Sequence, residues 1–140
     1  MTTLYTTEAV ATGGRTGSAT SSDGRLAVTL DTPKDLGGAG GAGTNPEQLF
    51  AAGYAACFLG ALKYVAGHKR MKLAEDSRVA VTVGVGPREY GKGFGLDLAL
   101  SVTLPGLTRE VAEDLVAQAD VVCPYSHLAR TDTAVRLSVA

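Results

Sequence analysis

The stretch T-N-P-E-Q-L-F-A-A-G-Y-A-A-C-F, residues 44–58, decides the fold. Asn45 is a favourable N-cap, Pro46 suits the first helical position because its missing N–H would have no partner there, and Gln48 completes a capping box. Residues 47–67 are almost all apolar or small. Since no polar stripe can be drawn on this segment, the sequence predicts a long helix buried on all sides.

Three glycines on this predicted helix, Gly53, Gly60 and Gly67, are spaced seven residues apart. They form a smooth strip where another backbone could approach closely. A short chain has little other mass to cover such a helix, so we expect a second copy of the chain to do so, in a homodimer. The alternative is that the glycines relieve packing within one subunit.

Length and composition are those of an ordinary globular domain, so we expect a single domain over residues 1–140. The 13 basic and 14 acidic residues form no long runs, which disfavours nucleic acid and anionic membranes as partners. The N-terminus has no secretory signal, and we expect no apolar run long enough to span a bilayer. The sequence therefore predicts a cytoplasmic protein.

Alternating apolar residues predict strands on both sides of the long helix. Residues 4–31 indicate three short strands separated by glycine-containing turns. Residues 78–86 and 96–104 alternate valine or leucine with smaller or polar residues, and the glycines between them predict an antiparallel hairpin. Residues 135–139 alternate in the same way and predict a last strand.

A second helix is predicted to begin after Thr108 and to end near Cys123, because Pro124 disfavours helical geometry at the residue before it. The order of strands, helix, strands, helix and strand is typical of an α+β domain with a largely antiparallel sheet.

The glycine-rich loop at residues 35–43 invites comparison with a phosphate-binding loop. The lysine that should follow Gly43 is missing, and Glu47 in the first helical turn would repel an anion. We therefore exclude nucleotide binding at this loop.

The two cysteines, Cys57 and Cys123, are core residues, metal ligands or a redox pair that cycles. Zinc is disfavoured because there is no C-x-x-C pair and Pro124 spoils a helical arrangement of Cys123 with His127. Cys57 lies inside the apolar helix, about three turns from its N-terminus, where burial favours the protonated thiol. Activation of Cys57 requires a nearby cation.

Arg15, in the segment G-G-R-T-G, is the candidate for that cation, because arginine stays charged even when it is desolvated. Glu47 can form a forked ion pair with the guanidinium and hold it in place. Glu47 and Cys57 are ten residues apart, roughly 15 Å along a straight helix. Either the helix is irregular near Gly53, or the site combines residues from two subunits.

Cys123 is the candidate resolving thiol, since its place at a helix end before Pro124 leaves its backbone adjustable. A disulfide with Cys57 requires Cα atoms within roughly 7 Å. The alternative is that both cysteines are inert core residues.

Three separated motifs resemble the organic hydroperoxide resistance proteins of the OsmC/Ohr family: L-Y-T-T-E-A-V-A-T-G-G-R-T-G at residues 4–17, the helix stretch at residues 44–58, and V-C-P-Y-S at residues 122–126. The resemblance runs nearly end to end and is greater to the Ohr branch than to the OsmC branch. It departs at His127, where the family usually has asparagine.

The resemblance implies an OsmC-like fold, with antiparallel sheets and a long buried central helix, in an intertwined homodimer with active sites at the subunit interface. It also implies a thiol peroxidase in which Cys57 is the peroxidatic thiol, Cys123 the resolving thiol, and Arg15 with Glu47 the activating pair. No cofactor or metal is bound; dihydrolipoyl groups, on a lipoylated protein or as dihydrolipoamide, are the expected external reductant.

The expected reaction reduces organic hydroperoxides to alcohols through a Cys57 sulfenic acid and a Cys57–Cys123 disulfide. An apolar site on a buried helix favours substrates with bulky apolar tails over hydrogen peroxide. Two alternatives are a redox-sensing dimeric module without turnover and a purely structural dimer.

Overall fold

A computed structural model describes residues 1–140 and separates the chain into two compact units, Met1–Leu49 and Phe50–Ala140. The boundary falls within the first turns of helix α1 (Pro46–His68). We call the two parts the N-terminal unit and the C-terminal unit. The expectation of a single domain over residues 1–140 stays a prediction.

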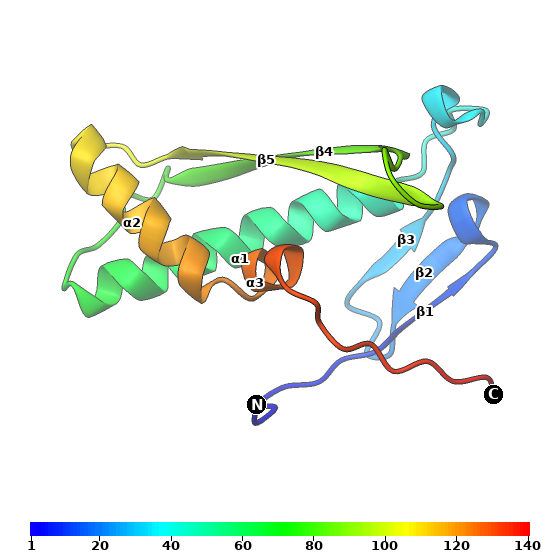
Figure 1. Cartoon of the computed structure of the whole chain (residues 1–140), viewed down its shortest axis with the longest axis horizontal. Helices are drawn as coiled ribbons and strands as arrows, with labels where there is room; N and C mark the ends of the chain where they lie inside the picture. Colours follow the sequence, from blue (N-terminus) through cyan, green and yellow to red (C-terminus); the bar gives the residue numbers. More distant parts are fainter. The chain divides into compact units, whose positions relative to one another are not determined.

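The N-terminal unit contains the predicted meander of three antiparallel strands (Figure 1). They are β1 (Ala9–Thr12), β2 (Ser18–Ser21) and β3 (Ala27–Thr29). These strands are shorter than expected, since β1 begins only at Ala9. A 3-10 turn, η1 (Gly14–Thr16), joins β1 to β2, and Gly13 and Gly14 before Arg15 have φ angles of 75° and 60°. Glycine adopts this left-handed conformation without steric cost, so the turn holds Arg15 at its centre.

The chain enters α1 as the sequence predicts. The short 3-10 turn η2 (Lys34–Leu36) opens the glycine-rich loop. Asn45 caps the helix, because its Oδ1 accepts a hydrogen bond of 2.9 Å from the backbone N–H of Gln48. The Gln48 side chain does not close a capping box; its Oε1 accepts a bond of 2.7 Å from the Thr44 hydroxyl instead.

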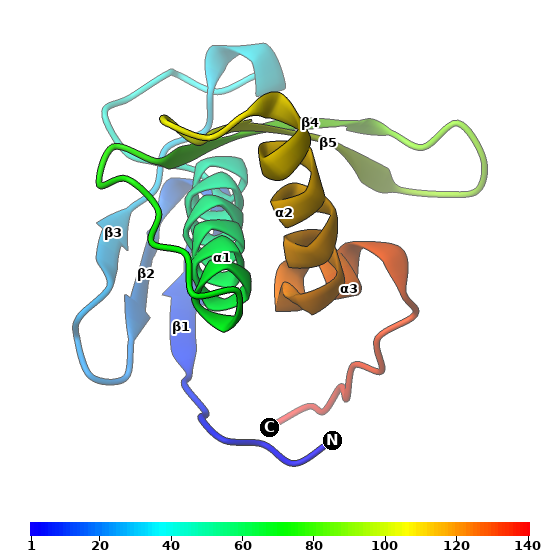
Figure 2. The ribbon, with the colours of Figure 1, turned by 90° about the vertical axis from the view of Figure 1, so that its left-hand side faces the viewer.

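The C-terminal unit is built from most of α1, the strands β4 (Arg78–Pro87) and β5 (Phe94–Thr103), and the helices α2 (Arg109–Val122) and α3 (Pro124–Arg130). The predicted hairpin is confirmed, with β4 antiparallel to β5. Figure 2 shows this hairpin lying across α1 and α2. The core between these layers consists of Tyr54, Phe58, Ala61, Leu62, Val65, Ala66, Leu73, Leu104, Leu115, Ala119 and Cys123.

Within one chain, helix α1 is buried along one side only, so burial of its other side by a second copy stays a prediction. Ala52, Ala56, Gly60, Lys63 and Gly67 are exposed along the opposite side. Hydrophobicity on every face shows that each face can be buried, but it does not show that one chain supplies enough cover. We call these five residues the exposed strip of α1.

The three glycines of α1 differ in their surroundings. A Cβ on Gly53 would lie 3.0 Å from the Tyr125 hydroxyl oxygen, so this glycine makes room for a side chain of its own subunit. A Cβ on Gly60 or Gly67 would meet open space. Close approach of another backbone is therefore possible at these two positions.

The C-terminal segment corrects two expectations. Residues 132–140 form no strand, and Val135, Leu137 and Val139 are 74–101% exposed. A strand needs an edge with which to pair, and none in this chain pairs with the segment. In contrast, Pro124 does more than end α2, because it occupies the first position of the unpredicted helix α3.

Helix α1 also corrects the expectation about apolar runs. It is 23 residues long and apolar enough, by length and composition, to cross a bilayer. A core helix of a globular protein has the same properties, and one side of α1 packs in the core.

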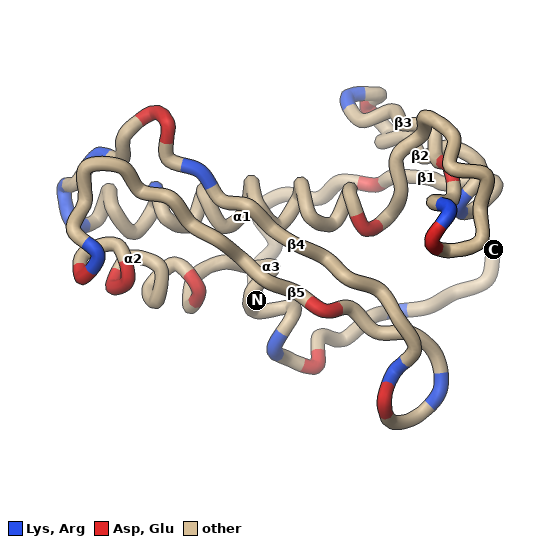
Figure 3. The backbone as a smooth tube through the Cα atoms, turned by 90° about the horizontal axis from the view of Figure 1, so that it is seen from above, with Lys and Arg blue, Asp and Glu red and all other residues tan.

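Charged residues of both signs are interspersed over helix ends and loops, and β4 and β5 carry few of them (Figure 3).

Replacing Leu115 with alanine tests this core. Leu115 in α2 is fully buried, so we expect Leu115→Ala to lower the free energy of unfolding by about 2–5 kcal/mol. Val121→Ala in the same helix removes an exposed side chain and is the matched control, with an expected change within about 0.5 kcal/mol. Urea unfolding measures both, and equal losses would contradict the described core.

Candidate active site

Arg15 and Glu47 form a forked ion pair within the N-terminal unit. Arg15 Nη1 and Nη2 donate to the two carboxylate oxygens of Glu47 at 2.8 and 2.6 Å. The 3-10 turn η1 presents Arg15, and the first turn of α1 presents Glu47. The side chains are 38% and 15% exposed, so the pair is only partly shielded from water. The fork expected from the sequence is therefore present.

The fork keeps both groups charged. Hydrogen bonds from the Arg15 guanidinium are the main reason that the pKa of Glu47 lies below its ordinary value. The same hydrogen bonds hold the pKa of Arg15 above its ordinary value. Arg15 thus remains a fixed cation across the physiological pH range.

The two cysteines meet in the C-terminal unit. Cys57 lies on α1 and is half-buried, whereas Cys123 is fully buried at the junction of α2 and α3. The Cys123 thiol donates to the Cys57 sulfur, and the two Sγ atoms are 3.6 Å apart. Cys123 has an extended backbone, with φ −70° and ψ 121°, as expected before Pro124. The sulfurs are in contact but not bonded.

Burial is the main influence on Cys57 and raises the pKa of its thiol. The backbone N–H of Tyr125 acts in the opposite direction by donating to the sulfur, and Cys123 adds a smaller upward effect on the pKa. No cation is among the groups that shift this pKa. The surroundings of Cys57 within the C-terminal unit therefore favour the neutral thiol.

A cavity of about 560 Å³ opens beside Cys57. Apart from the thiol and one tyrosine hydroxyl its side chains are apolar or small; it is lined by Cys57, Gly60, Ala61, Tyr64, Val122 and Pro124. We call it the thiol cavity. Its size and lining suit an apolar group placed next to the sulfur.

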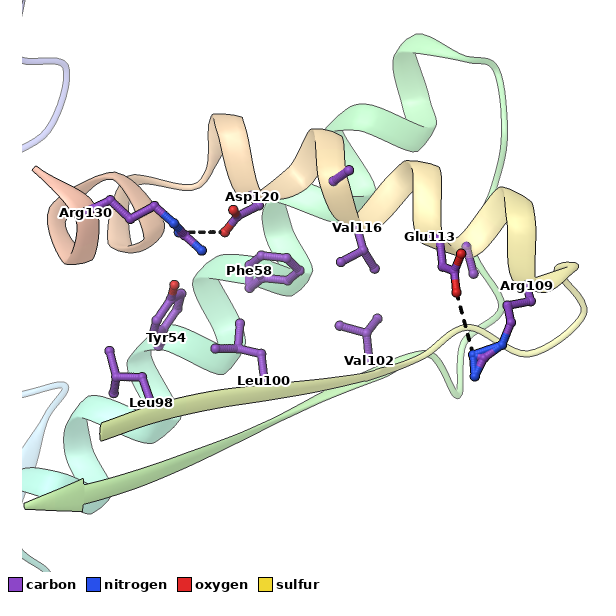
Figure 4. Close-up of a pocket in the computed structure, with 12 residues that line it drawn as sticks. Tyr54, Phe58, Leu98, Leu100, Val102, Arg109, Glu113, Val116, Asp120 and Arg130 are labelled. Atoms are coloured by element: carbon purple, nitrogen blue, oxygen red, sulfur yellow. Dashed lines mark hydrogen bonds and ion pairs between the residues drawn. The ribbon is translucent and has the colours of Figure 1, made fainter. Parts of the chain in front are cut away.

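A second cavity, of about 570 Å³, lies between α1, α2 and β5 (Figure 4). Apolar side chains such as Phe58 and Leu100 line its interior. Two ion pairs lie at its rim, Arg109 with Glu113 and Arg130 with Asp120. Neither cysteine lines this cavity, so it is separate from the thiol cavity.

The four residues predicted to form the site thus fall into two pairs, Arg15 with Glu47 and Cys57 with Cys123. Helix α1 is unbroken from Pro46 to His68, so the irregularity considered near Gly53 is not observed. The catalytic roles of the four residues stay predictions. No group of three or more His, Cys, Asp and Glu side chains gathers to hold a metal ion.

Sequence reasoning missed a buried hydroxyl pair next to the cysteines. The hydroxyl oxygens of Tyr54 and Ser126 are 2.8 Å apart and hydrogen-bonded. Ser126 belongs to the V-C-P-Y-S motif, but its partner is 72 residues away. No local pattern connects two such residues, so only the tertiary structure shows the pair.

The chain belongs to the class of α+β proteins with a long central helix, its two cysteines are in contact, and comparisons identify its family. The family model described as OsmC-like protein matches residues 38–138. A protein of Xanthomonas axonopodis pv. citri named organic hydroperoxide resistance protein is 50% identical over 137 residues, which cover 98% of this chain and 95% of that protein.

Solved structures agree with this match. The organic hydroperoxide resistance protein of Legionella pneumophila is 47% identical with a TM-score of 0.86, over 92% of both chains. OhrB of Bacillus subtilis, also an organic hydroperoxide resistance protein, is 44% identical with a TM-score of 0.83, over 91% of this chain and 93% of that one. The chain belongs to the organic hydroperoxide resistance branch of the OsmC-like family.

The fork between Arg15 and Glu47 predicts a pH-dependent contribution to stability. Because folding lowers the pKa of Glu47, the contribution is present above the unfolded value of about 4.3 and is lost as the pH falls through the folded value. We expect Glu47→Gln to be less stable than wild type near pH 7, by about 1 kcal/mol or less, and the difference to shrink towards about pH 3.

Urea unfolding midpoints at the two pH values measure this difference. Glu89→Gln, at an exposed residue that makes no ion pair, is the matched control and should show no such trend. A Glu47→Gln deficit that persists unchanged at acidic pH would show that the fork does not act through the charge of Glu47.

Proposed function

We propose that the protein is a cysteine-based peroxidase that reduces organic hydroperoxides to alcohols. Membership of the organic hydroperoxide resistance branch supports a role in resistance to such compounds. The observation that carries the proposal is the Cys57–Cys123 contact, with 3.6 Å between the sulfurs and an apolar cavity beside Cys57. The pair can store two oxidising equivalents as a disulfide with little movement.

The reaction begins when the Cys57 thiolate attacks the distal oxygen of the hydroperoxide and breaks the O–O bond. The leaving alkoxide takes a proton to become the alcohol, and Cys57 becomes a sulfenic acid. The Cys123 thiol then attacks the Cys57 sulfur, releasing water and forming the disulfide. An external dithiol restores both thiols by exchange; a dihydrolipoyl group is our proposal for this reductant.

The thiolate needs a cation, because burial raises the pKa of Cys57. We assign this role to Arg15, which Glu47 holds in place. The Arg15 guanidinium also stabilises the developing alkoxide. Ten residues along an unbroken α1 separate Glu47 from Cys57, roughly 15 Å. This separation favours a site shared between subunits of an intertwined homodimer, and the exposed strip of α1 offers a surface of mostly small residues, with Lys63 its one charge, for that assembly.

The thiol cavity supports a preference for organic over hydrogen peroxide. Its apolar lining gains nothing from hydrogen peroxide but can bury the apolar tail of a larger substrate. We propose a cytoplasmic location for the enzyme, because a reducing compartment maintains the two thiols between turnovers.

Steady-state assays with dihydrolipoamide and its reductase test this function. We expect wild type to consume cumene hydroperoxide faster than hydrogen peroxide, and Cys57→Ser to be inactive because it lacks the nucleophile. Cys123→Ser should still form a sulfenic acid but no intramolecular disulfide, which mass spectrometry after thiol alkylation detects. A redox-sensing module would form the disulfide once without sustained consumption of peroxide, and that outcome would refute the peroxidase.

Mixing two defective chains tests the shared site. If Arg15 serves Cys57 of the partner subunit, hybrids of Cys57→Ser with Arg15→Ala contain one intact site per hybrid dimer. Random mixing then restores about a quarter of the wild-type rate. Arg25→Ala, at another exposed arginine, is the matched control for Arg15→Ala and should retain activity. Failure of the mixture to exceed its parents would place Arg15 and Cys57 of each site in one chain.

A further inference from the structure

A hydroxyl pair in the core beside the cysteines has no part in the reaction described above. Tyr54 is 2% exposed and Ser126 is fully buried, and their hydroxyl oxygens are 2.8 Å apart. A buried hydroxyl without a partner is costly, so each of these residues depends on the other. Such a pair specifies one arrangement of the elements that carry it.

The two elements are the ones that carry the cysteines. Tyr54 precedes Cys57 by three residues on α1, so the two side chains are neighbours on one face of the helix. Ser126 follows Cys123 by three residues, in α3. The same two segments are therefore joined twice, by the sulfur contact of 3.6 Å and by the hydroxyl bond of 2.8 Å.

The hydroxyl bond matters because α3 is too short to hold its position through its own helical hydrogen bonds. It has seven residues, too few for a helix that is stable alone, and it follows the extended backbone of Cys123. The Tyr125 ring packs against the rings of Phe50 and Tyr54. At its far end Arg130 pairs with Asp120 of α2 at 2.9 Å, an exposed contact (Figure 4).

We propose that the Tyr54–Ser126 hydrogen bond is a positioning device for the resolving step, which holds the start of α3, and with it the Cys123 sulfur, against Cys57. This inference rests on the proposed peroxidase function. The bond is a buried link between the side chains of α1 and α3. The same turn of α3 carries the Tyr125 N–H that donates to the Cys57 sulfur.

The step that depends on this device is a competition for the Cys57 sulfenic acid. Attack by the Cys123 thiol gives the disulfide and water. Attack on a second hydroperoxide molecule by the sulfenate instead gives a sulfinic acid and a second alcohol, and this oxidation is not reversed by dithiols. If α3 is released, the Cys123 sulfur spends less time within reach, so the disulfide forms more slowly and the sulfinic share rises.

Tyr54→Phe and Ser126→Ala each remove one oxygen from the pair, and the double variant removes both. The matched controls are Tyr90→Phe, at an exposed tyrosine, and Ser77→Ala, at a buried serine whose hydroxyl has no partner. After one equivalent of cumene hydroperoxide, rapid acid quenching, thiol alkylation and mass spectrometry follow two rates: loss of the Cys57 thiol and formation of the disulfide.

We expect disulfide formation to slow on the order of tenfold in Tyr54→Phe and in Ser126→Ala, while the first oxidation of Cys57 stays within about twofold of wild type. With excess hydroperoxide, these variants should accumulate more Cys57 sulfinic acid than either control. The double variant should be no slower than the worse single variant, because both single changes remove the same bond.

The unchanged first oxidation shows in the same samples that the variants are folded around Cys57. Equal slowing of both steps would overturn the inference, since it would indicate general damage to the site. If wild type forms the disulfide and the variants form it equally fast, the positioning role is overturned but the proposed function is not. A wild type that never oxidises Cys57 would overturn the proposed function and this inference together.

Discussion

The burial of Cys57 is the constraint on which the rest of the site depends. The thiol lies against the core of the C-terminal unit, where loss of water raises its pKa and keeps it protonated. The same burial places its sulfur 3.6 Å from that of Cys123 and beside an apolar cavity. A more exposed thiol would ionise more easily but would lose both its place beside the apolar cavity and its protected contact with Cys123.

In the proposed mechanism, this constraint explains why the activating cation is an arginine held by a carboxylate. A lysine brought close to an apolar site can lose its proton, whereas a guanidinium keeps its charge and binds both oxygens of Glu47. Glu47 alone would oppose ionisation of a nearby thiol. Forked to Arg15, it becomes a guide for the cation, and the pair can approach an apolar surface at a lower desolvation cost than a lone charge.

The parts of the fold that could be predicted from sequence are those set by neighbouring residues. Four such features depend on a few consecutive side chains, and all are present: the Asn45 cap, the hairpin of β4 and β5, the Thr108 cap and the extended backbone of Cys123. The side of α1 that one chain leaves exposed was not predictable in this way. Apolar residues on every face show what the helix can bury, but not how much cover one chain provides.

The missing C-terminal strand has a similar cause. Alternation in residues 135–139 indicates one apolar side, but a strand also needs a free edge to pair with, and that is a property of the assembled sheet. Helix α3 was missed because Pro124 was interpreted only as a stop, although proline is equally suited to the first helical position. Both errors arise where one local pattern is compatible with two structures.

The fork and the hydroxyl pair illustrate two different ways of using polar groups. The fork of Arg15 and Glu47 is partly exposed, so water can exchange with it and the guanidinium can move at small cost. The bond between Tyr54 and Ser126 is fully buried, so breaking it leaves two hydroxyls without partners in an apolar core. Apolar packing of a seven-residue helix tolerates small shifts, but a directional bond between two hydroxyls does not. In the proposed mechanism, the resolving cysteine on its adjustable backbone therefore benefits from the rigid connection, and the activating cation benefits from the adaptable one.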